Sequence, residues 1–103
     1  HVGDPPDSRS IATALAKGVD MRDLRARKVE KGDFEAFDYV LAMDAGHFDL
    51  LSRYGTERLA LFLDKANVPD PYYGGQKDFD LVYALVDEAC GRLLRVLVEK
   101  HGL

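Results

Sequence analysis

Two apolar runs separated by one helical pattern organise the middle of the chain. Tyr39 to Met43 and Leu59 to Leu63 contain no charged side chain, which is typical of strands buried in a parallel sheet. Between them, Phe48, Leu51 and Tyr54 recur at helical spacing. The order strand, helix, strand predicts a right-handed βαβ unit and, with it, the α/β fold class.

Helical patterns flank this unit on both sides. Asp7 or Ser8 can cap a first helix, which Gly18 ends. A last helix is predicted from about Asp78 to His101. The apolar positions of the first helix are Ile11, Ala12, Leu15 and Ala16, and those of the last are Phe79, Val82, Tyr83, Val86, Cys90, Leu93 and Leu97.

The connection from Met21 to Lys31 is basic and irregular. We expect a solvated segment. A phosphate-attracting patch is the weaker alternative, because no aromatic residue is interleaved with the charges. Beyond this connection, Asp33 can cap a short turn through Phe34 and Phe37.

The most chemically varied stretch is Asp70-Pro71-Tyr72-Tyr73-Gly74-Gly75, called the 70–75 loop below. Asp-Pro starts turns and Gly-Gly ends them, so composition alone predicts an ordinary surface turn. Two adjacent rings in a loop are difficult to bury together, however, and exposed rings beside a carboxylate can hold a flat substrate. The residues alone leave both interpretations open.

The predicted topology brings two acidic positions to one edge of the sheet. Asp44 follows the first apolar run, and the connection from Asp64 to Lys77 follows the second. Both leave the carboxyl edge of a parallel sheet, where ligands bind in open α/β folds. His47 lies near this edge without a metal-ligand companion at useful spacing, so no metal site is expected.

Composition is that of one globular domain. The 103 residues are 47% hydrophobic, which is enough for one core. The net charge of −4, from 14 basic and 18 acidic residues, argues against nucleic acid or an anionic membrane as the main partner. No apolar run approaches the length of a membrane span, and a single cysteine fits a reducing compartment.

A resemblance covers essentially the whole chain. The apolar run followed by Asp-Pro-Tyr-Tyr-Gly and by a helix beginning Asp78-Phe79-Asp80 resembles the C-terminal part of the low-molecular-weight protein-tyrosine phosphatases. Weaker landmarks in the same order are Val2-Gly3, Pro6 to Arg9, Ala26-Arg27, Asp33-Phe34, Phe37 to Leu41 and Met43-Asp44. The resemblance implies part of a small three-layer αβα domain with a parallel, flavodoxin-like sheet, and residues 1–103 would be its C-terminal portion.

The resemblance also implies an activity and a set of roles. The activity is cytoplasmic hydrolysis of phosphotyrosine monoesters, on a phosphotyrosine protein or a small aryl phosphate, through a phosphocysteine intermediate and without a cofactor. Asp70 maps onto the general acid, and Tyr72 and Tyr73 onto the aromatic wall that receives the phosphotyrosine ring, with Tyr72 as the favoured substrate-facing member. Asp44 would support the phosphate-binding loop, or else merely cap the following helix.

The chain departs from the family pattern at the nucleophile. The family's cysteine, followed six positions later by arginine, has no counterpart, because Val96 stands six positions after Cys90. We expect Cys90 to be a buried, inert residue of the last helix. The chain alone should therefore be inactive, and either a missing N-terminal segment or another chain would supply the nucleophile.

Two alternatives remain beside the phosphatase. The first is a binding or regulatory module without a nucleophile, which would use the tyrosine wall alone to bind phosphotyrosine. The second is a thiol-dependent arsenate reductase of the same architecture. That chemistry needs resolving cysteines, and the sequence has only Cys90.

Overall fold

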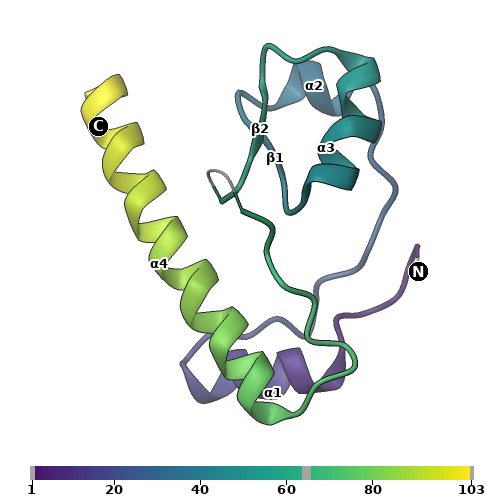
Figure 1. Ribbon diagram of the computed structural model, residues 1–103, viewed down its shortest axis with the longest axis vertical. Helices are drawn as coiled ribbons and strands as arrows, with labels where there is room; N and C mark the ends of the chain where they lie inside the picture. Colours follow the sequence, from purple (N-terminus) through teal and green to yellow (C-terminus); the bar gives the residue numbers. More distant parts are fainter. Residues whose placement is uncertain (1, 64–65, 103) are drawn as a thin grey trace. The chain divides into compact units, whose positions relative to one another are not determined.

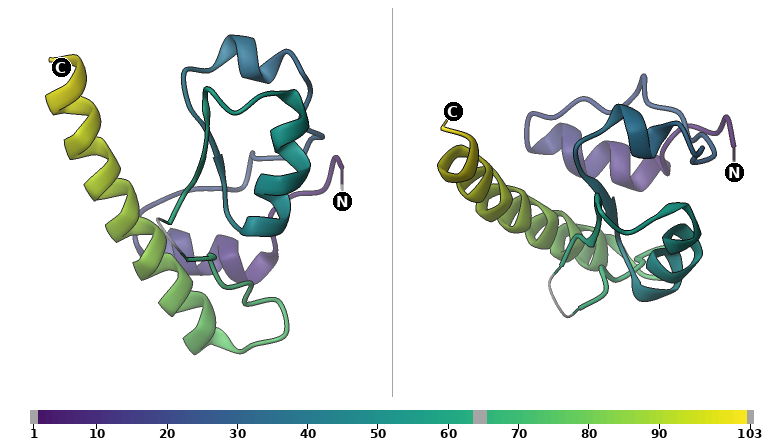
Figure 2. Two further views of the ribbon diagram at one scale, coloured as in Figure 1. Left: turned by 45° about the horizontal axis from the view of Figure 1, so that its top comes forward. Right: turned by 90° about the horizontal axis from the view of Figure 1, so that it is seen from above.

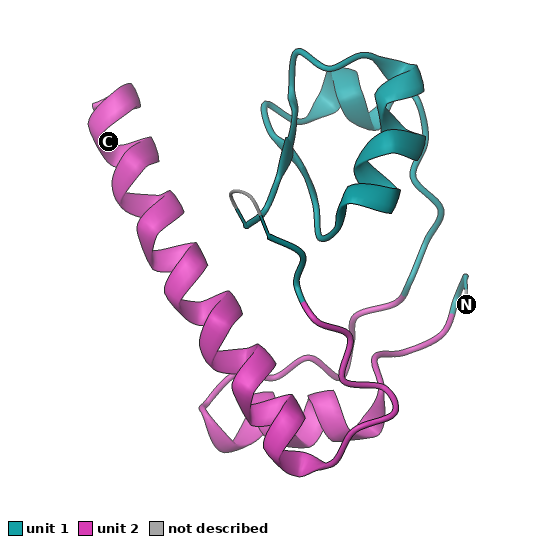
Figure 3. Ribbon diagram, in the orientation of Figure 1, with its two compact units in different colours: residues 1–3, 26–68 teal, residues 4–25, 69–103 magenta. Residues whose placement is uncertain are grey.

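The computed structural model describes residues 2–63 and 66–102, so Asp64 and Lys65, the first residues of the predicted 64–77 connection, lie outside the described residues. The described chain divides into two compact units (Figure 3). Unit 1 comprises the described residues among 1–3 and 26–68, and unit 2 comprises those among 4–25 and 69–103.

Unit 1 contains the predicted βαβ element (Figure 1). Strands β1 (Val40–Ala42) and β2 (Leu59–Leu61) pair in parallel, with Leu41 opposite Ala60. Helix α3 (Ala45–Leu51) and the 3-10 turn η1 (Ser52–Tyr54) connect them, and α3 packs against both strands. A short helix, α2 (Asp33–Ala36), precedes β1 at the predicted turn. The parallel strand pair with its helical crossover confirms the α/β class.

The strands are shorter and less buried than the apolar runs predicted. Tyr39 and Met43 lie outside β1 and are exposed, and Ala42 alone in β1 is buried. Beyond Ala42, whose carbonyl accepts the N–H of Phe62 at 2.8 Å, the Met43 carbonyl accepts the N–H of Val68, also at 2.8 Å. Asp44 follows at once as the residue that caps α3.

Unit 2 pairs two helices. Helix α1 (Ser8–Ala16) packs against α4 (Gln76–His101), and Figure 2 shows α1 beside the first turns of α4. Asp7 caps α1 by accepting the Arg9 backbone N–H at 2.8 Å, as predicted. Helix α4 begins two residues before the predicted Asp78, at Gln76, because the Asp78 carboxylate accepts the N–H of Gly75 at 3.0 Å and so caps the helix from inside.

The buried face of α1 differs from the predicted stripe. Thr13 and Ala14 are its buried residues, whereas Leu15 is exposed. The Thr13 hydroxyl accepts a 2.7 Å bond from the Gln76 amide and donates to the Arg9 carbonyl at 2.8 Å. The buried side of α1 thus makes a polar contact with the first turn of α4.

The prediction that Cys90 is buried was wrong, because the side chain is exposed. Phe79 and Ala89 are the buried residues of α4. Successive helical residues point about 100° apart, so the position after Ala89 turns away from the buried face. Exposure does not make Cys90 a nucleophile, since it still lies within a helix and has no arginine six positions on.

Gly74 is the position where the loop passes closest to α4. A Cβ added at Gly74 would contact the Asp78 carboxylate and lie 2.8 Å from the Asp78 Cβ, whereas a Cβ at Gly75 would meet nothing within 4 Å. Asp78 cannot turn away without releasing the Gly75 N–H. We expect Gly74→Ala to destabilise unit 2 by about 1–3 kcal/mol, the usual cost of overpacking.

Gly75→Ala is the matched control for this prediction, because its backbone angles (φ −102°, ψ −173°) suit any residue. Its effect should stay within about 0.5 kcal/mol. Thermal or urea unfolding of the two variants measures the difference, and equal midpoints for both would contradict the close approach.

Candidate active site

The 70–75 loop folds back on its own backbone. The Asp70 carboxylate accepts the N–H of Tyr72 at 3.0 Å, and the Pro71 carbonyl accepts the N–H of Gly74 at 2.8 Å. Proline fixes one backbone angle between these two bonds. The carboxylate of Asp70 therefore stands on a closed turn rather than on an extended connection.

Both tyrosine rings of the loop are available to a ligand. They meet edge to face, with ring centroids 5.0 Å apart and planes at 84°. Tyr72 is 55% exposed and Tyr73 is 97% exposed. The expectation that adjacent rings in this loop would not both be buried is confirmed.

Arg9 holds the loop against the start of α1, and sequence reasoning missed its role. Its guanidinium donates to the carbonyl of Tyr72 at 2.8 Å and to that of Gly74 at 3.1 Å. It also donates to both carboxylate oxygens of Asp7, at 3.1 and 2.9 Å. Hydrogen bonding to Arg9 lowers the pKa of Asp7, and the same bond raises the pKa of Arg9.

The Arg9 guanidinium also contacts two aromatic rings. Its central carbon lies 4.4 Å from the ring centroid of Phe79, a buried residue of α4, and 5.7 Å from that of Tyr72. Both distances are within the range of cation–π attraction. One side chain therefore joins the cap of α1, the loop and the first turn of α4.

A shallow hollow adjoins this loop on the α4 side. Its volume is about 270 Å³, and it is lined by Pro69, Asp70, Pro71, Tyr73, Gly74, Asp78, Leu81 and Val82. A carboxylate and an exposed ring thus border one concave surface, which is the combination that the sequence predicted for holding a flat substrate.

Asp44, the fourth predicted site residue, belongs to unit 1. Its carboxylate accepts the His47 N–H at 2.8 Å and lies 2.9 Å from the His47 ring Nδ1. The backbone bond and then the ring contact lower the pKa of Asp44. The capping role that the sequence allowed for Asp44 is therefore present, and a role toward a phosphate loop stays a prediction.

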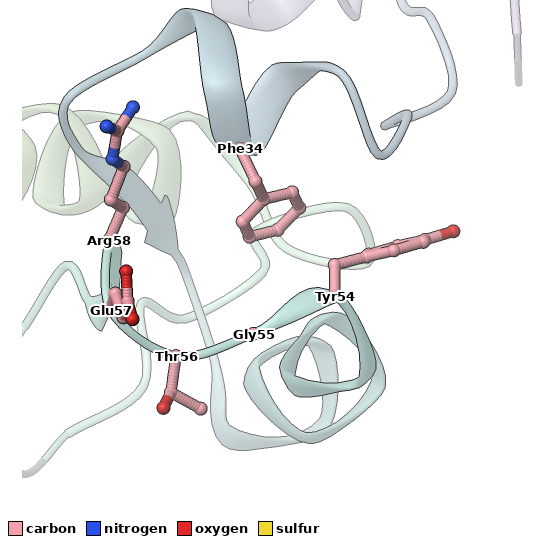
Figure 4. A pocket seen from close by; sticks show the side chains of 6 residues that line it. All are labelled: Phe34, Tyr54, Gly55, Thr56, Glu57 and Arg58. Atoms are coloured by element: carbon pink, nitrogen blue, oxygen red, sulfur yellow. The ribbon is translucent and has the colours of Figure 1, made fainter.

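A second hollow in unit 1, of about 420 Å³, was not predicted (Figure 4). Phe34 and Tyr54 contribute two tilted rings with centroids 5.4 Å apart. The Arg58 guanidinium points away from these rings and donates to the carbonyls of Glu35 and Phe37. The Arg53 guanidinium carbon lies 4.8 Å from the centroid of the Tyr54 ring, and the same group donates to the Tyr54 hydroxyl at 2.9 Å. We do not assign this hollow any chemistry.

The residues that the structure describes were also searched for metal ligands and membrane spans. Within ranges 2–63 and 66–102, no three His, Cys, Asp or Glu side chains gather as a metal site would require. Among the same residues, no helix combines the length and the apolar character needed to cross a bilayer.

Low pH should break the ion pair between Arg9 and Asp7. The native pKa of Asp7 lies below its ordinary 3.8, so the pair contributes its full stabilisation above pH 3.8 and loses it as the pH falls through the lowered value. In an NMR acid titration, the Nε–H resonance of Arg9 should move with an apparent pKa below 3.8. Asp7→Asn should abolish that movement, and a midpoint at or above 3.8 would show that the pair does not form.

Known proteins are similar to this chain over nearly its whole length. The family model of low molecular weight phosphotyrosine protein phosphatase matches residues 1–102. The low molecular weight protein-tyrosine-phosphatase YfkJ of Bacillus subtilis is 35% identical over 113 residues, covering 100% of this chain and 71% of the relative. The low molecular weight phosphotyrosine protein phosphatase of Gallus gallus is 32% identical over 117 residues, covering 97% of this chain and 67% of the relative.

Solved structures agree with the sequence comparisons. A crystal structure of a protein tyrosine phosphatase from Entamoeba histolytica matches with a TM-score of 0.85 and 31% identity, covering 100% of this chain and 71% of that chain. The fold is therefore the α/β fold of these phosphatases, as the sequence predicted. The chain belongs to the low molecular weight phosphotyrosine protein phosphatase family.

Proposed function

We propose that this chain carries the acid loop of a protein-tyrosine phosphatase, with Asp70 as general acid. The observation that supports this most directly is the 70–75 loop, where a carboxylate on a closed turn stands beside two exposed tyrosine rings. A phosphotyrosine ester needs a proton donor at its phenolic oxygen and an apolar surface for its ring. The loop offers both within a few residues.

The proposed reaction has two steps. A cysteine thiolate attacks phosphorus, the P–O bond to the phenol breaks, and the Asp70 carboxyl gives its proton to the departing oxygen. Asp70 then takes a proton from water as the water's oxygen attacks phosphorus and the S–P bond breaks, so inorganic phosphate leaves and the thiolate returns. General acid catalysis of this kind contributes ~10² to 10⁴ in rate, about 3–5 kcal/mol.

The two rings have a role in binding. Tyr72 and Tyr73 stand edge to face, so a substrate ring packed on the face of one meets the edge of the other. Such aromatic contacts are worth about 0.5–1.5 kcal/mol beyond the area they bury. We assign Tyr72 as the substrate-facing ring because Arg9 holds its backbone carbonyl, whereas Tyr73, which lines the hollow with Asp70, is almost fully exposed.

The proposal assigns the nucleophile to residues outside this sequence. The chain spans about two thirds of the length of its relatives and contains no cysteine followed six positions later by arginine. We propose that residues 1–103 are the C-terminal portion of one phosphatase domain, which acts in the cytoplasm. A preceding segment or another chain would supply the thiolate, and that assembly is called the nucleophile-bearing protein below.

A binding module is the second candidate, and the pair of exposed rings favours it in the absence of a nucleophile. It predicts that the 103-residue chain alone binds a phosphotyrosine peptide and leaves the phosphate ester intact. The phosphatase proposal predicts no turnover by the chain alone and turnover by the nucleophile-bearing protein. Calorimetry with the peptide and release of inorganic phosphate separate the two.

Asp70→Asn should lower kcat/KM of the nucleophile-bearing protein by ~10² to 10⁴ on phenyl phosphate, because the amide cannot protonate the phenolic oxygen. The loss should be much smaller on p-nitrophenyl phosphate, whose leaving group is stable without a proton. Asp87→Asn, an exposed position in α4, makes the same charge change away from the loop and should leave both rates unchanged. Equal rates for Asp70→Asn and the unsubstituted protein would exclude Asp70 as the acid.

The role of Asp44 can be tested by removing its charge while keeping its ability to cap α3. Asparagine caps helices as well as aspartate does, so Asp44→Asn should keep the stability of unit 1, whereas Asp44→Ala should cost about 0.5–2 kcal/mol. If the carboxylate supports the phosphate loop, Asp44→Asn should still lower kcat/KM by roughly 10-fold, a 1.4 kcal/mol effect. Unchanged kcat/KM in Asp44→Asn would reduce the role of Asp44 to the cap.

A further inference from the structure

We propose that Arg9 is a positioning residue for catalysis: it fixes the 70–75 loop so that the Asp70 carboxyl and the Tyr72 ring meet the substrate in one geometry. The proposal rests on the phosphatase function proposed above. It adds a residue that lies in another element of unit 2 and that no local sequence pattern connects with the loop.

The first support is the number of bonds that converge on one side chain. Arg9 donates to two backbone carbonyls of the loop, those of Tyr72 and Gly74, and to both oxygens of Asp7. The guanidinium is planar and carries five donors in a fixed fork. Bonds made along fixed directions determine the orientation of the loop as well as its distance from α1.

The second support is the path from Arg9 to the acid. The carbonyl of Tyr72 accepts from Arg9, while the N–H of the same residue donates to the Asp70 carboxylate. Pro71 stands between Asp70 and Tyr72 and restricts rotation there. Fixing the Tyr72 backbone therefore fixes the hydrogen-bond donor that orients Asp70.

The third support is the stacking of Arg9 on rings. The buried Phe79 ring lies 4.4 Å from the central guanidinium carbon and holds the group from the α4 side. The Tyr72 ring lies 5.7 Å from the same atom. Arg9 thus contacts both the Tyr72 ring and the Tyr72 backbone carbonyl. In this proposal, the same side chain therefore positions the ring that binds the substrate and the carboxyl of Asp70.

A lysine cannot reproduce this arrangement. Its ammonium is a compact charge on a flexible stem, without the planar fork that serves Asp7 and the two carbonyls together. Arg9→Lys keeps the charge and most of the apolar stem. A loss of catalytic activity in Arg9→Lys would therefore result from the changed hydrogen-bond geometry of the side chain and not from a change in net charge.

The test compares leaving groups in the nucleophile-bearing protein. A displaced acid weakens the step that protonates the leaving group, so Arg9→Lys should lower kcat/KM on phenyl phosphate by on the order of 10- to 100-fold. The loss on p-nitrophenyl phosphate should be several-fold smaller. Inhibition by inorganic phosphate should stay unchanged, because phosphate alone does not need the acid.

Arg92→Lys is the matched control. Arg92 pairs with Glu88 at 3.0 Å on the exposed side of α4, remote in sequence from the loop, and its replacement should change no rate. Rates are expressed per folded molecule, measured by circular dichroism at the assay temperature. A variant that only unfolds in part would then keep the unsubstituted rate on both substrates. That result, or an equal loss on both substrates, would overturn the proposal.

The outcomes also separate this proposal from the one on which it rests. If Asp70→Asn loses activity on phenyl phosphate and Arg9→Lys does not, the role of Arg9 is wrong and the phosphatase assignment stands. If Asp70→Asn has no effect, the acid assignment is wrong. In that case the role of Arg9 falls with it, even if NMR shows the Tyr72 and Gly74 amides moving in Arg9→Lys.

Discussion

The fork of Arg9 is the contact on which the arrangement of unit 2 depends. Helix α1 buries little of its apolar surface, since Thr13 and Ala14 are its buried residues and Leu15 is exposed. What ties it to the loop and to α4 is a set of directed polar bonds and one stacked ring. Directed bonds are satisfied in few geometries, whereas apolar contacts tolerate sliding, so the link specifies position as much as it supplies stability.

Unit 1 depends on a different constraint. Parallel strands cannot be joined by a tight hairpin, so a helical crossover must lie between β1 and β2. That requirement brings Asp44 to the end of β1, at the start of the crossover helix, where its carboxylate meets free backbone N–H groups. The helical crossover therefore allows the two strands to pair in parallel and also places an oriented carboxylate at the edge of the sheet.

The sequence predicted those features that depend on neighbouring residues. Asp7 and Asp44 cap helices because a short acidic side chain bonds an N–H two or three positions on, and the strand pair follows from two apolar runs. Cys90 was placed wrongly because it lies at the margin of an apolar stripe, where one helical step separates buried from exposed. The role of Arg9 was invisible, since its loop partners are 63 and 65 residues away and both are backbone carbonyls.

The adjacent glycines at positions 74 and 75 suggest a hinge, and their surroundings argue for the opposite. Gly74 has no room for a side chain beside Asp78, its carbonyl is held by Arg9, and the N–H of Gly75 is held by Asp78. This end of the loop is clamped to the helix that follows it. Any opening of the 70–75 loop would have to pivot ahead of Pro71, or carry the first turn of α4 along as one rigid body.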